Sequence, residues 1–309
     1  MPGLLAVLIA TACLLGAMAP AGAEPRAGVY RLTVGDFEVV ALSDGAGKRP
    51  VGQQLQLLYG DREKNRDALT RAYPDGQVDS TVNAFLIDTG AKLVLVDTGN
   101  GQSAGPAMGR VLANLRAAGY QPENIAEIYL THMHGDHLGG LVAGTERVFP
   151  NATVYVHQLE ADYWLNESNL AAAPASVQRT FQAAKKALAP YIDAGKFKTF
   201  AGNITLTPGI RAEAAFGHTP GHTAYFVESK GETLVLWGDI IHVAAVQFAD
   251  PAVTIAYDSD TAVAAQTRRQ LLAAAADNGW LIGGAHLAFP AFGHARATAD
   301  GGYAFTPLD

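Results

Sequence analysis

The sequence predicts an α+β four-layer sandwich, in which two β-sheets face each other and helices cover their outer sides (an αβ/βα arrangement). Hairpin patterns occur in both halves of the 309-residue chain, and helical patterns lie between them. No repeat or low-complexity linker divides the chain. Because each sheet and helix must bury one face against another element, these observations together favour a layered sandwich formed by a single domain.

The N-terminal part supplies two hairpins. Val29 to Leu42 alternates between apolar and polar residues and breaks at Val34-Gly35-Asp36, which predicts the first hairpin. A second hairpin is predicted where Thr81 to Ile87 and Lys92 to Val96 flank a turn at Asp88-Thr89-Gly90.

The segments around the second hairpin differ in character. Gly45 to Gln77 is polar and irregular, and we expect an arm or lid with a short helix around Arg62 to Ala72. After the hairpin, Pro106 opens a predicted helix to Ala118, and Gly119 ends it. The apolar run Ile125 to Leu130 then predicts a buried strand.

The C-terminal half continues with alternating strands and helices. Asp260 can cap the Ala-rich helix Thr261 to Ala276, and Gly279 can end it. The other predicted elements are a strand from Thr153 to His157, a helix from Val177 to Leu188 ended by Pro190, hairpin strands Thr223 to Val227 and Thr233 to Leu236 around Lys230-Gly231, and a last strand from Trp280 to Ala285.

The first 23 residues are expected to be a signal peptide, and residues 24–309 to form the mature domain. Leu4 to Met18 is an uncharged apolar run, too short to span a membrane, and an A-x-A pattern follows it just before Glu24. The only cysteine, Cys13, lies in this leader, so the mature chain would contain no disulfide. We therefore expect a secreted or periplasmic protein that has no membrane anchor after signal removal.

The stretch Thr131 to His137 follows a predicted strand and contains three histidines and an aspartate. Alternation on an extended segment sends His132 and His134 to the same side, and the following turn can bring Asp136 and His137 to the same point. Such a cluster suits two metal ions side by side better than one.

Four more polar residues stand at predicted strand ends, where loops gather to form sites. His222 lies on a Pro-Gly turn, Asp239 closes an apolar strand, and His286 follows the last strand. Asp97 follows the strand that ends at Val96.

The chain resembles the metallo-β-lactamase superfamily in the order of its motifs. These are H-x-H-x-D-H, then P-G-H-T, then an aspartate after an apolar strand, and finally a late histidine. Within this superfamily, the chain looks closest to the methyl parathion hydrolase and lactonase branch. The segments that carry the resemblance are Gly35-Asp36-Phe37-Glu38, Lys92 to Gly99, Ala117 to Gln121, Ile128 to Gly140, Asp162 to Leu165, Thr219 to Thr223 and His286 to His294.

The resemblance implies two divalent metal ions. His132, His134 and His222 would hold the first ion, Asp136, His137 and His286 the second, and Asp239 would bridge them. Imidazole and carboxylate ligands without thiolate suit zinc in an open catalytic site. Two ions about 3.5–4 Å apart can hold a bridging hydroxide that attacks a carbonyl carbon or phosphorus, while Asp136 passes a proton to the leaving group.

Residues around this centre have alternative interpretations. Asp97 is expected either to orient a ligand histidine or to cap a turn. Trp164 and Phe181 match aromatic positions of the substrate pocket in the resembled branch, or pack on helix faces. Ala104 replaces an aromatic residue of the phosphotriesterase, which opens one pocket wall and argues against phosphotriesterase activity as the main function. The remaining histidines are expected to be structural: His157 exposed on a strand, and His218, His242 and His294. For His242, three residues past Asp239, the alternative is a position facing the substrate.

These features predict a secreted dinuclear-zinc hydrolase of esters or lactones, with phosphotriesters as side substrates. The alternatives are a β-lactamase, which does not use a bridging aspartate such as Asp239, a glyoxalase-II-like thioesterase, and a non-catalytic metal-binding protein. A net charge of −7 without a basic cluster argues against nucleic acid as a partner, and we expect a small-molecule substrate. The resemblance also implies that the chain can form a homodimer.

Overall fold

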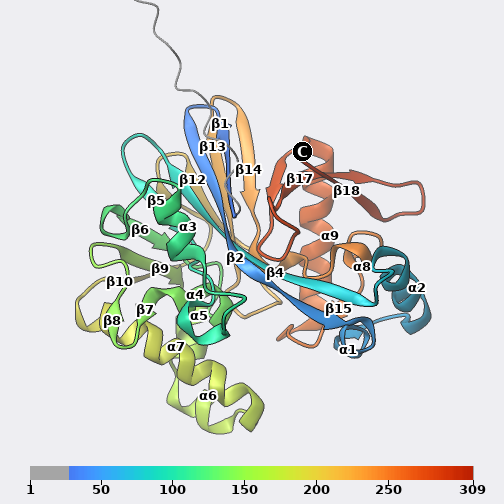
Figure 1. The fold of residues 1–309 in the computed structure, drawn as a ribbon, viewed down its shortest axis with the longest axis horizontal. Helices are drawn as coiled ribbons and strands as arrows, with labels where there is room; N and C mark the ends of the chain where they lie inside the picture. The colour runs from blue at the N-terminus through green and yellow to red at the C-terminus, as the bar shows by residue number, and fades with distance from the viewer. Residues whose placement is uncertain (1–27, 309) are drawn as a thin grey trace, which may run out of the picture.

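The computed structural model describes residues 28–308, which form two seven-stranded sheets packed face to face (Figure 1). The expected signal peptide lies outside the described residues. In sheet order, the first sheet contains β1 (Val29–Val34), β2 (Phe37–Pro50), β4 (Gln77–Asp88), β5 (Leu93–Val96), β6 (Glu127–Tyr129), β9 (Thr153–His157) and β10 (Phe197–Phe200). The second contains β11 (Ile204–Thr207), β12 (Ile210–Ala214), β13 (Thr223–Ser229), β14 (Glu232–Leu236), β16 (Leu281–Gly283), β17 (Phe292–Ala297) and β18 (Tyr303–Pro307).

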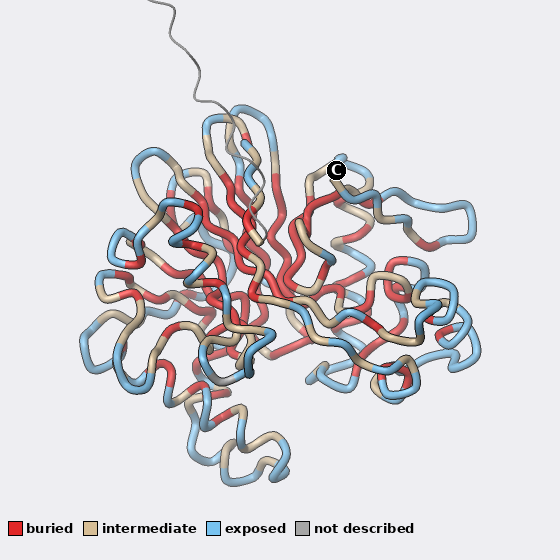
Figure 2. Tube along the Cα trace, in the orientation of Figure 1, coloured by how far each residue is buried: buried red, intermediate tan, exposed pale blue. Residues whose placement is uncertain are grey.

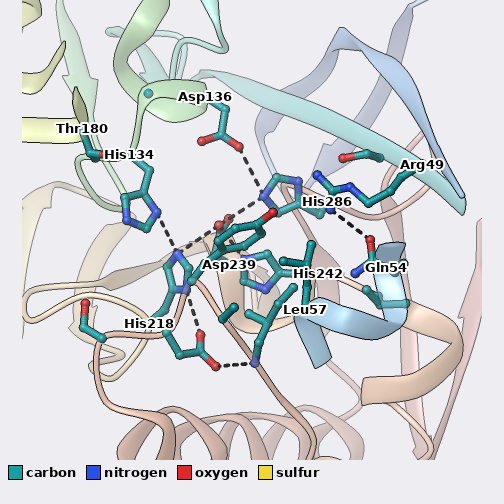
Figure 3. Close-up of a pocket in the computed structure, with 18 of the residues that line it drawn as sticks. Arg49, Gln54, Leu57, His134, Asp136, Thr180, His218, Asp239, His242 and His286 are labelled. Carbon is teal, nitrogen blue, oxygen red and sulfur yellow. Dashed lines mark hydrogen bonds and ion pairs between the residues drawn. The ribbon is translucent and has the colours of Figure 1, made fainter. Parts of the chain in front are cut away.

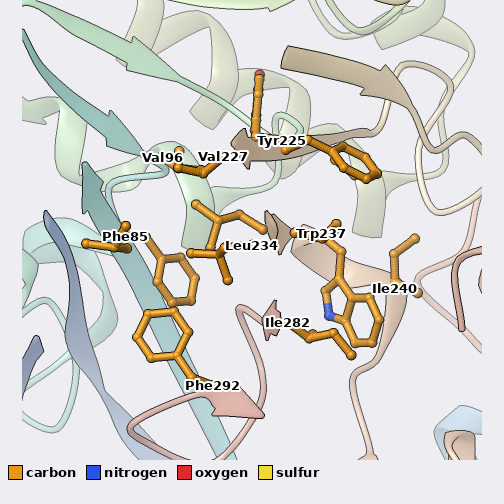
Figure 4. Packing of buried hydrophobic residues seen from close by; sticks show 14 of the residues in the cluster. Phe85, Val96, Tyr225, Val227, Leu234, Trp237, Ile240, Ile282 and Phe292 are labelled. Carbon is orange, nitrogen blue, oxygen red and sulfur yellow. The ribbon is translucent and has the colours of Figure 1, made fainter. Parts of the chain in front are cut away.

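Alternation along the central strands of the first sheet creates two cores. On β2, Val39 and Ala41 face the second sheet, whereas Val40 and Leu42 pack toward the helices. Buried residues gather along the strands at the centre of the fold (Figure 2), and the core between the sheets includes Phe292 (Figure 4). A sheet that is buried on both faces requires a layer on each side, which confirms the predicted αβ/βα sandwich.

Helices form the outer layers and the loops around the site. Helices α3, α5 and α7 pack against the first sheet, and α9 packs against β17 of the second. The helices are α1 (Val51–Leu57), α2 (Arg62–Ala72), α3 (Val111–Ala117), α4 (Gly135–Leu138), α5 (Gln158–Trp164), α6 (Glu167–Ala172), α7 (Ala175–Asp193), α8 (Ala244–Gln247) and α9 (Thr261–Asn278). In the described part of the chain, none of them has the length and apolar character needed to cross a membrane.

Elements with strong local signals lie where they were predicted. Both N-terminal hairpins form, and β9 spans the predicted residues. Asp260 caps α9 by accepting a hydrogen bond from the Val263 backbone N–H at 3.0 Å, and Gly279 ends the helix at φ 64°.

Two predicted helix boundaries are wrong. The helix expected from Pro106 begins only at Val111, because Gly109, inside the predicted helix, adopts a φ of 77° that a right-handed helix cannot contain. Pro190 does not end α7, which runs to Asp193. A proline in the last turn removes only one backbone donor, and the chain closes after it through other carbonyls of that turn.

The arm (residues 45–77) extends the hairpin of β2 and β4 and contains the predicted helix α2. Its short strand β3 (Leu58–Tyr59) pairs with β15 (Thr254–Ile255). Leu55 and Leu69 of the arm pack in a small core with Val243 and Val253. The arm is therefore anchored on the segment that follows Asp239, beside the candidate site.

Candidate metal centre

The predicted site residues converge where strands of both sheets end (Figure 3). The Thr131–His137 stretch follows β6, whose parallel neighbours β5 and β9 end at the same edge. Asp239 follows β14, and His286 follows β16, which lies parallel to β14. The Thr223 N–H donates to the Thr131 carbonyl at 2.9 Å, which joins the two sheets at this point.

Three groups of side chains place ligand atoms within 4.8 Å of one another. The groups are His132, His134, His218 and Asp239; Asp136, His137 and His286; and Asp239, His242 and His286. Among the described residues, the Asp239 carboxylate is the central contact: its oxygens lie 3.6 Å from His132 Nε2, 3.1 Å from His137 Nε2 and 3.1 Å from His286 Nε2. Asp239 thus lies between two groups of donors, as expected for a bridging ligand.

The structure corrects the assignment of His222. Both ring nitrogens of His222 contact the backbone: Nδ1 contacts the Ala215 carbonyl at 3.0 Å, and Nε2 accepts from the Asp239 N–H at 3.0 Å. His218 occupies the expected place instead, with Nε2 at 3.3 Å from Asp239 and 3.1 Å from His134 Nδ1. The two histidines flank the same Thr-Pro-Gly turn, and no spacing in the sequence shows which one faces the cavity.

Asp97 lies in the position expected for a residue that orients a ligand. Its Oδ2 is 2.8 Å from Nδ1 of His137, and its Oδ1 accepts from the Thr131 N–H at 2.8 Å. Asp97 adopts φ 58°, which brings the carboxylate back over the end of its own strand. This contact fixes the His137 ring with Nε2 toward Asp239.

Two buried carboxylates that sequence reasoning missed support the ligand loops. Asp258 contacts His218 Nδ1 at 2.9 Å and lies 3.8 Å from the guanidinium of buried Arg268. Glu160, on α5, accepts from the N–H groups of Met133 at 3.0 Å and Gly221 at 2.8 Å. Neither residue belongs to a recognisable motif, because its role depends on loops distant in sequence.

The donor atoms of this centre fit divalent cations. Several of these atoms are buried without a hydrogen-bond partner in the described chain. They are Nε2 of His132, Nε2 of His137, Oδ1 of Asp239 and both ring nitrogens of His242. Such atoms are costly to bury unless a cation or another partner satisfies them. Nitrogen and carboxylate donors without sulfur are the ligands of catalytic zinc sites.

In the metal-free centre, the ionised Asp239 carboxylate is surrounded by histidine rings of two kinds. Burial would lower the pKa of His137, His286 and His218, but Asp239 and other carboxylates raise the pKa of the first two above the ordinary value and that of His218 to about 9, so metal binding releases protons from these rings. Burial lowers the pKa of His134 to about 3 and that of His242 to about 4. Burial would raise the pKa of Asp239, but His137, His286 and other histidines hold it well below its usual value. Neutral imidazole and ionised carboxylate are the forms that bind metal.

A cavity of about 860 Å³ opens onto the centre. Trp164 lines it, and its ring lies 5.4 Å from that of His134, in agreement with the predicted pocket position. Phe181 does not line the cavity, and its fully buried ring packs against Trp164 in the helix layer. Tyr163 lines the cavity instead, while Ala104 lies exposed in a 3-10 turn and forms no part of the wall.

The other histidines differ in how well the sequence predicted them. His242 lines the cavity, with Nε2 3.0 Å from Asp239, so its place is in the centre. His157 is buried and caps α5 by accepting from the Leu159 N–H at 3.2 Å, so the prediction of an exposed strand residue is wrong. His294 contacts the Trp280 carbonyl at 3.1 Å, which agrees with a structural role.

Comparisons with known proteins agree with this geometry. The family model described as the Metallo-beta-lactamase superfamily matches residues 78–286. An N-acyl homoserine lactonase of Bacillus cereus is 25% identical over 227 residues, which cover 67% of this chain and 81% of that protein. The crystal structure of hydrolase AbOPH in the beta lactamase superfamily superposes with a TM-score of 0.86 and 36% identity, covering 93% of this chain and 99% of AbOPH. AidC, a dizinc quorum-quenching lactonase solved with a product, superposes with a TM-score of 0.80 and 28% identity, covering 91% and 98% of the two chains.

Proposed function

Because the chain belongs to the metallo-beta-lactamase superfamily, we propose that it is a dinuclear-zinc lactonase that also cleaves aryl esters, with phosphotriesters as side substrates. Its relatives are metal-dependent hydrolases, and its histidine and aspartate groups fit two divalent ions. The observation that carries the proposal is the position of Asp239, which lies between two groups of donor atoms at the base of a large cavity.

Residues of both ligand loops would hold the ions. His132, His134 and His218 would bind one ion, Asp136, His137 and His286 the other, and Asp239 both. Zinc held by these residues would supply hydroxide at neutral pH and would polarise the carbonyl of the substrate.

Asp136 is the residue best placed to move a proton. Its side chain lines the cavity and is 32% exposed, and one of its oxygens lies 3.6 Å from His286 Nε2. Burial would raise its pKa, but His137 and His286 hold the pKa below its ordinary value, so the carboxylate is ionised at neutral pH. It would accept the proton that is released when water becomes the attacking hydroxide, and would deliver this proton to the oxygen that leaves as the acyl C–O bond breaks.

The cavity walls support an ester or lactone with an apolar part. Tyr163, Trp164 and Tyr257 offer aromatic surface, and Val177 and Ile255 add aliphatic surface. Such walls would hold an acyl chain or aryl group while the carbonyl lies at the polar base.

The test is a hydrolysis panel run on protein with quantified zinc: an N-acyl homoserine lactone, phenyl acetate, paraoxon, nitrocefin and S-lactoylglutathione. We expect fastest turnover of the lactone or the aryl ester, loss of turnover on chelation and its return with zinc. Turnover that chelators leave unchanged would contradict the metal-dependent mechanism. Fastest turnover of nitrocefin or S-lactoylglutathione would replace the proposal with β-lactamase or thioesterase activity.

A further inference from the structure

The cavity contains a cationic side chain that the hydrolytic mechanism does not use. Arg49 is the only lysine or arginine among the described residues that line the cavity. It lies near the end of β2, where the chain alternates between half-buried and exposed residues, and it belongs to the half-buried side. The neighbouring Lys48 belongs to the exposed side.

Gln54 holds the Arg49 side chain at the cavity wall. The Arg49 Nη1 donates to Gln54 Oε1 at 3.0 Å, and Gln54, on α1 of the arm, is only 2% exposed (Figure 3). A guanidinium group has five N–H donors, and this contact uses one of them. The amide oxygen therefore fixes the cation while leaving donors for another group.

No carboxylate of residues 28–308 forms an ion pair with Arg49. Asp79, which also lines the cavity, pairs with Lys48 at 2.7 Å. Asp258 pairs with His218 at 2.9 Å, and the two other aspartates of the cavity belong to the metal centre. Because the nearby carboxylates have other partners, the charge of Arg49 remains available to a ligand.

Arg49 lies at a fixed distance along the hairpin from the metal centre. It pairs with Val78 of β4, and Thr81 of the same strand accepts from the His286 ring at 2.7 Å. Thr81 lies three positions after Val78 along β4, which corresponds to about 10 Å of strand. This distance accommodates a short acyl chain between the centre and the cation.

We propose that Arg49, positioned by Gln54, binds a carboxylate of the substrate, so that the cavity takes lactones or esters with an anionic group several atoms from the cleaved bond. A guanidinium fork matches a carboxylate in shape and forms charge-assisted hydrogen bonds with it. This inference rests on the proposed function and names the substrate class for it.

The experiment compares monophenyl adipate with methyl phenyl adipate, which share the leaving group and differ in the distal charge. The wild-type zinc enzyme should hydrolyse the monoanion with the higher kcat/KM. In Arg49→Met, kcat/KM for the monoanion should fall about 10- to 100-fold, mainly through KM, while the value for the methyl ester stays within about threefold. Lys64→Met, the control at an exposed cation of the arm that does not line the cavity, should leave both values unchanged. Arg49→Lys should retain part of the preference.

Binding measurements separate this inference from the hydrolytic proposal. Isothermal titration of the non-hydrolysable N-phenyladipamic acid and its methyl ester into the zinc protein requires no turnover. Tighter binding of the acid that Arg49→Met abolishes supports the anion site even if neither phenyl ester is hydrolysed. Equal affinity for acid and ester, or a preference for the acid that persists in Arg49→Met because the metal ions alone bind it, would overturn the inference while leaving lactone hydrolysis intact.

Discussion

The buried carboxylate of Glu160 provides the sharpest test of how the two ligand loops are held together. Its Oε1 accepts from the Met133 N–H at 3.0 Å and from Trp164 Nε1 at 2.8 Å, and its Oε2 accepts from the Gly221 N–H at 2.8 Å. Met133 lies between His132 and His134, and Gly221 follows His218 on the other loop. Glu160→Gln keeps the shape of the side chain but replaces one acceptor with a donor.

The expected loss of unfolding free energy in Glu160→Gln follows from these contacts. In its better orientation, the amide keeps the two bonds of Oε1 and turns its NH₂ group toward the Gly221 N–H. This loses one charge-assisted hydrogen bond, about 1.5–3 kcal/mol, and leaves a buried N–H unpaired, about 1–3 kcal/mol. Burial raises the pKa of Glu160, so the neutral amide also removes part of the cost of burying a charge. A net loss of about 2–4 kcal/mol in unfolding free energy remains.

The assay combines thermal unfolding of the metal-free protein with a zinc competition titration. For a domain of this size, the loss corresponds to a decrease in Tm of about 5–10 °C. Zinc affinity should also fall about 10- to 100-fold, as for other residues that orient metal ligands. Glu167→Gln, an exposed glutamate on α6, is the control and should change stability by less than about 0.5 kcal/mol. Glu160→Gln protein with unchanged Tm and unchanged zinc affinity would refute the reasoning.

Four further predictions concern the same site and the leader. Asp258→Asn should weaken zinc binding about 10- to 100-fold by competition titration, because the amide no longer favours the His218 tautomer that presents Nε2; unchanged affinity would exclude this role. Asp136→Asn should lower kcat in samples matched for zinc content, and full activity would show that another group carries the proton. Burial would lower the pKa of His218, but Asp239 and Asp258 raise it to about 9, so its contribution to metal-free stability should be complete below about pH 6.5 and lost toward pH 9 in pH-dependent unfolding. Since zinc needs the neutral ring, zinc affinity should rise over the same range. After export, mass spectrometry should find a mature chain that begins at Glu24.

Local signals explain which parts of the fold could be predicted. The α9 boundaries follow from one capping aspartate and one glycine, and β9 follows from alternation, so each depends on neighbouring residues only. Strands β17 and β18 could not be predicted because their sequence pattern is weak. They are stabilised by pairing, β17 with β16 and β18 with β17. The arm could not be placed from sequence, because its position depends on β3 pairing with β15, about 200 residues away.

In the metal centre too, the residues with a local sequence signal could be predicted, and those that depend on distant segments could not. The histidines of the Thr131–His137 stretch, Asp239 and His286 could be predicted because each stands at the end of an apolar strand, and strand ends meet at one edge of a parallel sheet. The choice between His218 and His222 has no such local cause. Both rings are buried, and both stand beside the same turn.

The two histidines differ in role because distant segments supply them with different hydrogen-bond partners. Both ring nitrogens of His222 contact backbone groups, including the N–H of Asp239. These contacts fix the loop that presents the central carboxylate. His218 receives Asp258 on Nδ1, which leaves Nε2 toward the centre. Asp258 is in turn held near Arg268 of α9 and lies beyond β15, the strand that the arm pairs with. The ligand role that we propose for His218 therefore depends on the same segment that anchors the arm. A change that detaches β3 from β15 should weaken zinc binding at His218 and also alter the cavity wall that presents Arg49.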